Sequence, residues 1–233
     1  PTFDVTAIVK EVIENVVSNG DKALYQYALK FDKANLDTLA VSKQEIEDAV
    51  NSIDKEFLDI LKRAKQNIWE FHQKQLREGF EIKKENGIIL GQKIIPIEKV
   101  GLYVPGGTAS YPSTVLMDAI PAKIAGSKQI VMVTPPDKNG KINPAILAAA
   151  YVAGVDKIFK VGGAGAVAAL AYGTESIAKV DKIVGPGNAF VAEAKRQVFG
   201  KVSIDMIAGP SEIMVVADKF SNFTDSDYSQ VVT

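Results

Sequence analysis

The chain has 233 residues, of which 47% are hydrophobic and 24% are charged, and its formal net charge is −1. This ordinary globular composition suits one large domain or two small ones, and it gives no electrostatic reason to expect nucleic acid or an anionic membrane as a partner. The absence of cysteine and the single histidine, His72, exclude disulfides, a Cys nucleophile, thiolate zinc sites and a two-histidine metal site within one chain. No apolar run reaches about 18 residues, and no signal-peptide pattern is present, so we expect a cytoplasmic protein.

The first part of the chain predicts helices followed by a hairpin. Apolar residues recur at helical spacing, Asn19-Gly20 is a stop signal, and Ser42 with Glu45 forms a capping box. We expect helices at 4–18, 21–31, from Ser42 to about Ile53, and from Lys55 to about Leu76. Asn86-Gly87 lies between apolar runs at 80–84 and 88–97, which is a strong hairpin signal.

From Val100 onward, short apolar runs alternate with alanine-rich segments. Strands are expected at 99–104, 129–134, 157–161, 181–184, 203–207 and 212–217. Helices are expected at 112–126, 143–154, 164–172 and 188–199. This rhythm is typical of an α/β fold with a parallel sheet flanked by helices, and the right-handed crossover rule favours an incomplete Rossmann-like arrangement.

Three glycine-rich loops follow expected strands. They are Tyr103–Thr108, the Gly-x-Gly-x-x-Ala pattern in Val161–Ala168, and Gly185-Pro186-Gly187-Asn188. Alone, each has a plain structural explanation: an ordinary turn, tight packing of small residues, or a helix cap. Because ligands of open α/β sheets bind at the carboxyl ends of strands, the three together favour a nucleotide-like ligand. The acidic residue about 20 positions after the second pattern is Asp181, which precedes a strand rather than ending one.

Other polar residues have weaker claims to chemistry. His72 lies on a long helix, where a lone histidine is usually a surface or half-buried residue. Asp205 and Glu212 flank a second elbow, Gly209-Pro210, and could form an acid–base pair, although solvation at strand ends is the commoner role. Lys195-Arg196 most simply belongs to the outer face of its helix.

The pattern divides the chain into three parts. Residues 1–98 hold the helices and the hairpin, which we expect to belong to a domain completed by later sequence. Residues 99–218 form the Rossmann-like domain, and residues 219–233 are a polar, aperiodic tail that we expect to be truncated or incomplete. Because residues 1–98 do not close a core alone, we expect exposed apolar surface and dimerisation or poor solubility.

Three long segments carry a family resemblance: VGLYVPGGTASYPSTVLMDAIPAKIAG, KVGGAGAVAALAYGTESIAKVDKIVGPGNAFVAEAKRQV and IDMIAGPSEIMVVAD. Together they closely resemble histidinol dehydrogenase, over most of the chain up to about Asp218. The resemblance implies two incomplete Rossmann-like domains in an intertwined homodimer. It also implies oxidation of L-histidinol through the aldehyde to L-histidine in histidine biosynthesis, with two NAD molecules reduced and one zinc ion per site.

The resemblance implies specific site residues. Tyr103 and Asn188 match residues that contact NAD, and Ser211 matches a serine that contacts the substrate. A third NAD contact of the family is a glutamine, but this sequence has Gly165 at that position, so its hydrogen bonds are missing. The family's zinc ligands and its catalytic Glu-His pair have no recognisable counterpart, so we expect no catalytic or metal-binding residue in this chain and no turnover by it alone.

Three functions remain open from the sequence. The leading one is the N-terminal, NAD-side half of histidinol dehydrogenase. The second is a non-catalytic nucleotide-binding or assembly module, which the glycine at position 165 and the missing ligands favour. The third is a different NAD-dependent dehydrogenase built on the same sheet.

Overall fold

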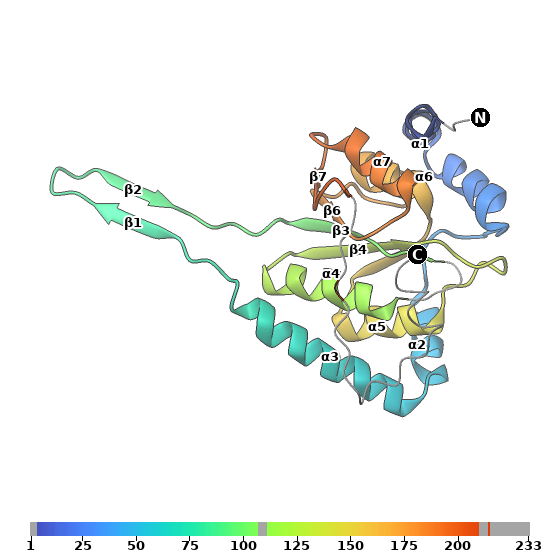
Figure 1. The fold of residues 1–233 in the computed structure, drawn as a ribbon, viewed down its shortest axis with the longest axis horizontal. Helices are drawn as coiled ribbons and strands as arrows, with labels where there is room; N and C mark the ends of the chain where they lie inside the picture. The colour runs from blue at the N-terminus through green and yellow to red at the C-terminus, as the bar shows by residue number, and fades with distance from the viewer. Residues whose placement is uncertain (1–3, 107–110, 210–213, 215–233) are drawn as a thin grey trace.

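A computed structural model describes residues 4–106, 111–209 and Met214. Helices cover both faces of a central sheet, and a two-stranded hairpin projects from one end (Figure 1). The helices are α1 (Val5–Tyr27), the π-helical turn η1 (Ala28–Asp32), α2 (Lys43–Ser52), α3 (Lys55–Gln73), α4 (Pro112–Ile124), α5 (Pro144–Ala153), α6 (Gly163–Tyr172) and α7 (Ala189–Val198). The strands are β1 (Phe80–Lys83), β2 (Ile89–Gln92), β3 (Lys99–Tyr103), β4 (Gln129–Thr134), β5 (Lys157–Lys160), β6 (Lys182–Val184) and β7 (Ser203–Ile204).

The central sheet confirms the predicted α/β, Rossmann-like class. The described residues place five strands in it, all parallel, in the order β5-β4-β3-β6-β7. The chain runs outward from β3 through β4 to β5 and then returns to the other side of β3 with β6. The strand order therefore reverses between β3 and β6, and ligands of open α/β sheets bind at such a point, outside the carboxyl ends of the strands.

Each face of the sheet has its own apolar core. Because successive residues of a strand point to opposite faces, Tyr103, Val131 and Val133 pack with α1, α6 and α7, while Leu102 and Met132 pack with the helices on the other face. Both faces are buried, which explains why the strands are almost continuously apolar. Figure 1 shows α1, α6 and α7 on one side of the sheet and α2 to α5 on the other.

The helices before β3 follow the predicted pattern closely. Gly20, with φ of 52°, interrupts α1 where the stop signal was read, and the capping box of Ser42 and Glu45 starts α2. α1 packs against α6 and α7, α2 against α5, and α3 against α4. Helices from residues 1–98 thus contribute to both cores of the sheet, while the boundary after residue 98 stays a prediction.

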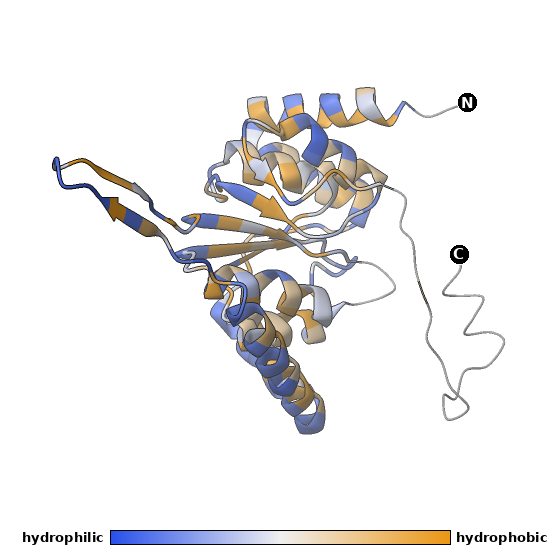
Figure 2. Ribbon diagram, turned by 60° about the vertical axis from the view of Figure 1, so that its left-hand side comes forward, coloured by the Kyte–Doolittle hydropathy of each residue, from blue (hydrophilic) through white to orange (hydrophobic). Residues whose placement is uncertain are grey.

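The hairpin of β1 and β2 is confirmed, with Gly87 in the left-handed region at φ of 82°. All eight of its strand residues are exposed, and Figure 2 shows the apolar stretches that it carries away from the body. Two strands are shorter than predicted: β2 ends at Gln92, beyond which no strand of the described ranges pairs with the chain, and β7, at the edge of the sheet in those ranges, ends at Ile204. The expected strand 212–217 and the tail 219–233 lie outside the described residues.

None of the helices in the described ranges is long and apolar enough to cross a membrane.

Candidate functional site

The loops after β3, β4 and β5 meet in close contacts that only glycine permits. A Cβ on Gly106 would lie 2.5 Å from Pro135 Cγ, and one on Gly162 would lie 2.6 Å from Pro135 Cβ. Both distances are far below ordinary contact, so any side chain at either position would collide with the proline ring. The glycines are therefore needed for packing, and they also leave bare backbone at the carboxyl edge of the sheet.

Tyr103 ties two of these loops together. It is the last residue of β3, and its hydroxyl oxygen accepts a hydrogen bond of 3.0 Å from the backbone N–H of Gly163, the first residue of α6. Burial raises the pKa of the Tyr103 hydroxyl, against the effect of that hydrogen bond. Only 4% of Tyr103 is exposed, so little of its ring is accessible, and its clearest role in the structure is to hold the turn after β5.

Asn188 is the N-cap of α7. Its side-chain oxygen accepts a hydrogen bond of 3.1 Å from the backbone N–H of Val191, and the residue is exposed. A Cβ on the preceding Gly187 would lie 2.3 Å from Val191 Cγ1, so this turn also requires glycine. Because the cap uses only the oxygen, the Asn188 amide nitrogen remains able to donate to a ligand at the start of a helix, where anions are favoured.

Gly165 faces α1 rather than the open edge of the sheet. A Cβ at this position would lie 3.3 Å from Tyr27 Cδ2 and 3.6 Å from Leu24 Cδ2. Tyr27 is held in place, since its hydroxyl accepts a hydrogen bond of 2.8 Å from the Asn15 amide and its ring stacks on Phe31. In this chain, α1 occupies the space into which a side chain at 165 would begin.

A cluster of three charged side chains lies beside the turn after β6. Lys195, from α7, is only 5% exposed, donates to the Gly185 carbonyl oxygen at 2.9 Å, and forms an ion pair with Asp205. Asp205 also accepts a hydrogen bond of 3.0 Å from the Gly185 N–H. The prediction that Lys195 lies on the outer face of its helix is wrong, because its carboxylate and carbonyl partners draw it inward; Arg196 is the exposed member of the pair and binds Glu193.

Asp118, on α4, is the third member of this cluster. Its Oδ2 atom is buried and has no hydrogen-bond partner among the described residues, and it lies 3.0 Å from the place of a Cβ on Gly185. Burial, and then the nearby charge of Asp205, raise the pKa of Asp118 to about 7, while Lys195 opposes the change. Sequence reasoning missed this residue, since no local pattern marks an aspartate near the middle of an apolar helix.

Two other candidates lie away from the turn after β6. His72 is in the last turn of α3, where its Nδ1 is 2.7 Å from Gln75 Oε1, next to the hairpin. Asp181 accepts a hydrogen bond of 2.9 Å from the Lys99 N–H, which places it at the amino ends of β3 and β6, at the opposite edge of the sheet from the glycine-rich turns. Ser211 and Glu212 lie outside the described residues.

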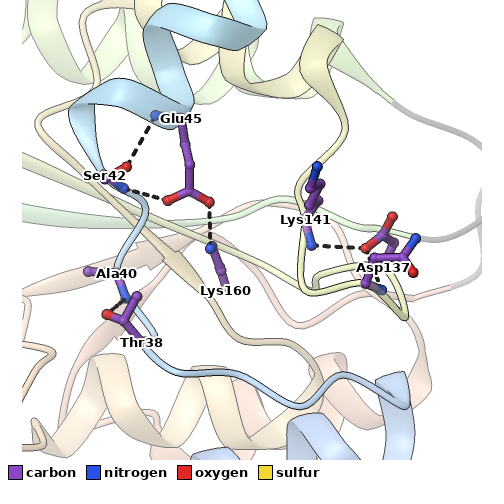
Figure 3. Close-up of polar contacts among 8 residues, drawn as sticks. Thr38, Ala40, Ser42, Glu45, Asp137, Lys141 and Lys160 are labelled. Atoms are coloured by element: carbon purple, nitrogen blue, oxygen red, sulfur yellow. Dashed lines mark hydrogen bonds and ion pairs between the residues drawn. The ribbon is translucent and has the colours of Figure 1, made fainter.

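A second ion pair anchors the far side of the sheet. Lys160, the last residue of β5, is 7% exposed and contacts Glu45 at 2.5 Å, and Glu45 also accepts a hydrogen bond from the Ser42 N–H (Figure 3). Burial raises the pKa of Glu45, but the hydrogen bonds and charge of Lys160 and Ser42 outweigh it, so the net pKa is lowered. This pair fastens the start of α2 to the sheet.

The described residues do not fit a zinc ion. No group of three or more His, Cys, Asp or Glu side chains is placed to hold a metal within 4–106 and 111–209. The Asp118 cluster contains a lysine that already binds one of its two carboxylates, which is the wrong charge for a cation site. The described residues fit a nucleotide better than a zinc ion, because exposed backbone, the start of α7 and the Asn188 amide nitrogen, which the helix cap does not use, lie at the carboxyl edge of the sheet.

Comparison with known proteins identifies the family. The histidinol dehydrogenase family model matches residues 2–225. Histidinol dehydrogenase from Clostridium acetobutylicum is 57% identical over 94% of this chain and 51% of its own length, and that from Listeria innocua is 60% identical over 91% and 49%. A crystal structure of histidinol dehydrogenase from Elizabethkingia anophelis superposes with a TM-score of 0.87 and 44% identity, over 95% of this chain and 52% of that one. The chain spans about half the length of these relatives, and it belongs to the histidinol dehydrogenase family.

Proposed function

We propose that this chain is the N-terminal, NAD-side half of a histidinol dehydrogenase, which oxidises L-histidinol through the aldehyde to L-histidine with NAD as the oxidant. Family membership supports the reaction class. The observation that carries the proposal is the position of Asn188: it caps a helix at the point where the strand order reverses, and none of the described residues accepts a hydrogen bond from its amide nitrogen.

The residues of the crevice would bind and orient the nucleotide. The N–H groups at the start of α7 and the Asn188 amide suit a phosphate or a ribose hydroxyl, and Tyr103 holds the glycine turn after β5 in shape. When bound, NAD accepts the hydride from the substrate carbon. Ser211, from the second elbow, would orient the substrate.

We expect the zinc ligands and the acid–base groups to lie outside the described residues. The described residues offer no zinc site, and the chain spans about half of its relatives. We therefore expect the chain alone to bind nucleotide without oxidising histidinol. Gly165, which cannot make the hydrogen bonds of a glutamine, favours a second candidate: a non-catalytic nucleotide-binding or assembly module derived from the same fold.

The proposal includes a cytoplasmic homodimer. The chain has no cysteine and so needs no oxidising compartment to form disulfides. The projecting hairpin exposes Phe80, Ile82, Ile89 and Leu90, a group of apolar side chains that a partner surface would cover. Light scattering on the purified chain tests this part, and a monodisperse monomer would contradict it.

Titration calorimetry with NAD tests nucleotide binding. We expect the wild-type chain to bind NAD, and Asn188→Ala to bind it about 2- to 10-fold more weakly, as the loss of one hydrogen bond implies. Ser42→Ala is the matched control, because Ser42 also caps a helix but lies beyond β5 on the other side of the sheet. No heat with millimolar NAD, or equal affinity in Asn188→Ala and wild type, would contradict the proposal.

Reconstitution separates the enzyme from the module. The chain is co-expressed with the C-terminal half of the Clostridium acetobutylicum relative, and NADH formation from L-histidinol is followed by absorbance. Turnover in this complex, but not by the chain alone, would support the dehydrogenase. A stable complex that binds NAD but forms no NADH would favour the module. Turnover of another alcohol from a substrate panel would favour a different NAD-dependent dehydrogenase.

A further inference from the structure

The turn that begins at Gly185 is held by polar contacts on both sides of one residue. The Gly185 N–H donates to Asp205 Oδ2 at 3.0 Å, and the Gly185 carbonyl accepts from Lys195 Nζ at 2.9 Å. Gly185 has φ of 115°, and a Cβ there would lie 2.1 Å from the Tyr103 carbonyl oxygen. Backbone that is held this closely has few ways to move without breaking a buried hydrogen bond.

The same two side chains connect three elements of the fold. Lys195 lies on α7, Asp205 follows β7, and Gly185 follows β6. Asp205 also accepts a hydrogen bond of 2.8 Å from the Met206 N–H, so its carboxylate reaches both the turn after β6 and the segment that leads to the second elbow. The Lys195 and Asp205 side chains are only 7% and 27% exposed, and an ion pair so shielded from water is costly to break on one side only.

These contacts act on Asn188 through a short closed path. Asn188 starts α7, Lys195 lies farther along the same helix, and Lys195 returns to Gly185, three residues before Asn188. The turn 185–188 is thus clamped at one end by Lys195 and Asp205 and at the other by the cap on Val191. We call the contacts of Lys195 and Asp205 with Gly185 the clamp, and we expect a change in these contacts to shift the Asn188 amide relative to the sheet edge.

Asp118 is placed to disturb this clamp. Its buried Oδ2 atom approaches Gly185, and the titratable groups that act on it are Asp205, after β7, and Lys195, on α7. When Asp118 carries a proton, Lys195 interacts with the charge of one carboxylate among the described residues, that of Asp205. When Asp118 is ionised, its negative charge repels Asp205 and attracts Lys195 without an ion pair among the described residues, and this weakens the hold of Lys195 on Asp205 and on the Gly185 carbonyl.

We propose that Lys195 and Asp205 are positioning residues that hold Asn188 for nucleotide binding, and that Asp118 competes with Asp205 for Lys195. The effect of the clamp on NAD binding rests on the proposed function, whereas the geometry of the clamp does not. Neither Lys195 nor Asp205 needs to touch the ligand. Their effect is on where the turn presents the Asn188 amide.

Backbone amide NMR of the 15N-labelled chain without NAD tests the clamp directly. In the wild type, we expect the Gly185 and Asn188 amide signals to titrate together between pH 5 and 9, with a midpoint near 7. Asp118→Asn should remove that titration. Lys195→Met should move both signals at pH 6, and Lys195→Arg should restore them in part. Arg196→Met is the matched control, since it removes a neighbouring positive charge from the exposed side of α7.

NAD affinity is then measured by calorimetry on the same variants. We expect Lys195→Met to weaken binding about 2- to 10-fold, by no more than Asn188→Ala does, because misplacing the amide can at most lose the hydrogen bond that it makes; Arg196→Met should leave the affinity unchanged. If Lys195→Met does not fold, Asp205→Asn, which keeps the shape of the side chain, takes its place. If Lys195→Met gives the same amide signals and the same NAD affinity as Arg196→Met, Lys195 has no positioning role. If the wild-type Gly185 and Asn188 amide signals do not titrate, Asp118 does not compete with Asp205. If the wild type binds no NAD, the proposed function fails, while the amide signals still decide the clamp.

Discussion

Gly165→Gln restores the residue that the family resemblance implies, and the structure predicts that it is harmful in this chain. The new Cβ would meet Tyr27 at 3.3 Å and Leu24 at 3.6 Å, and the rest of the side chain must find space between α1 and α6. Tyr27 cannot move freely, because it accepts a hydrogen bond from Asn15 and stacks on Phe31. Overpacking of this kind costs about 1–3 kcal/mol of stability.

Gly165→Ala separates the first contact from the longer side chain. Alanine gains about 1 kcal/mol over glycine within a helix, and the tight contact with Tyr27 offsets part of this. We therefore expect Gly165→Ala to stay within about 1 kcal/mol of the wild type. Urea denaturation, monitored by circular dichroism, gives the free energy of unfolding of Gly165→Gln and of Gly165→Ala, and calorimetry gives their NAD affinity. A Gly165→Gln variant as stable as the wild type would refute the packing argument.

Three further predictions concern buried polar groups. Tyr103→Phe leaves the Gly163 N–H without its acceptor and should cost about 1–3 kcal/mol in urea denaturation, whereas unchanged stability would mean that water replaces the hydroxyl. Because the pKa of Glu45 is lowered in the fold, ionised Glu45 stabilises the protein above about pH 4.5, and this stabilisation is lost as the pH falls. Glu45→Gln should therefore lower the melting temperature at pH 7 but much less at pH 3. An equal loss at both pH values would contradict the pairing with Lys160. The raised pKa of Asp118 has the opposite effect on stability: the free energy of unfolding falls as the pH rises from about 4 to about 7, by at most about 4 kcal/mol. Asp118→Asn should therefore be more stable than the wild type at pH 8, by about 1–3 kcal/mol, but no more stable than the wild type at pH 4. If the variant is less stable than the wild type at pH 8, the ionised Asp118 carboxylate makes a favourable pair with a positive group such as Lys195.

Local sequence patterns predicted the elements of the fold well. The Ser42–Glu45 capping box, the Asn86-Gly87 hairpin and the cap at Asn188 each depend on residues a few positions apart, so the sequence alone reveals them. The alternation of apolar strands and alanine-rich helices likewise predicted the parallel sheet. The packing of α1 on α6 and α7 was not predicted, because helical spacing reveals an apolar face without naming its partner.

Local sequence patterns did not predict which residues form the polar clamp around Gly185. Lys195 and Arg196 are adjacent and chemically alike, and nothing local says which of them points inward. The choice depends on Asp205, which follows a later strand, and on the Gly185 carbonyl, which lies at the end of another. Asp118 joins them from a helix on the opposite face of the sheet. The sequence did predict the turn that these residues hold, because its glycines and its cap are contiguous.

Amide chemical-shift mapping with NAD locates the nucleotide site on the sheet. NAD is titrated into the 15N-labelled chain, and the shifted signals are placed on the structure. We predict the largest changes at Gly162, Gly163, Gly185 and Asn188, at the carboxyl ends of β5 and β6, with little change in the hairpin. Changes confined to the hairpin or to the amino ends of the strands, or none at millimolar NAD, would contradict it.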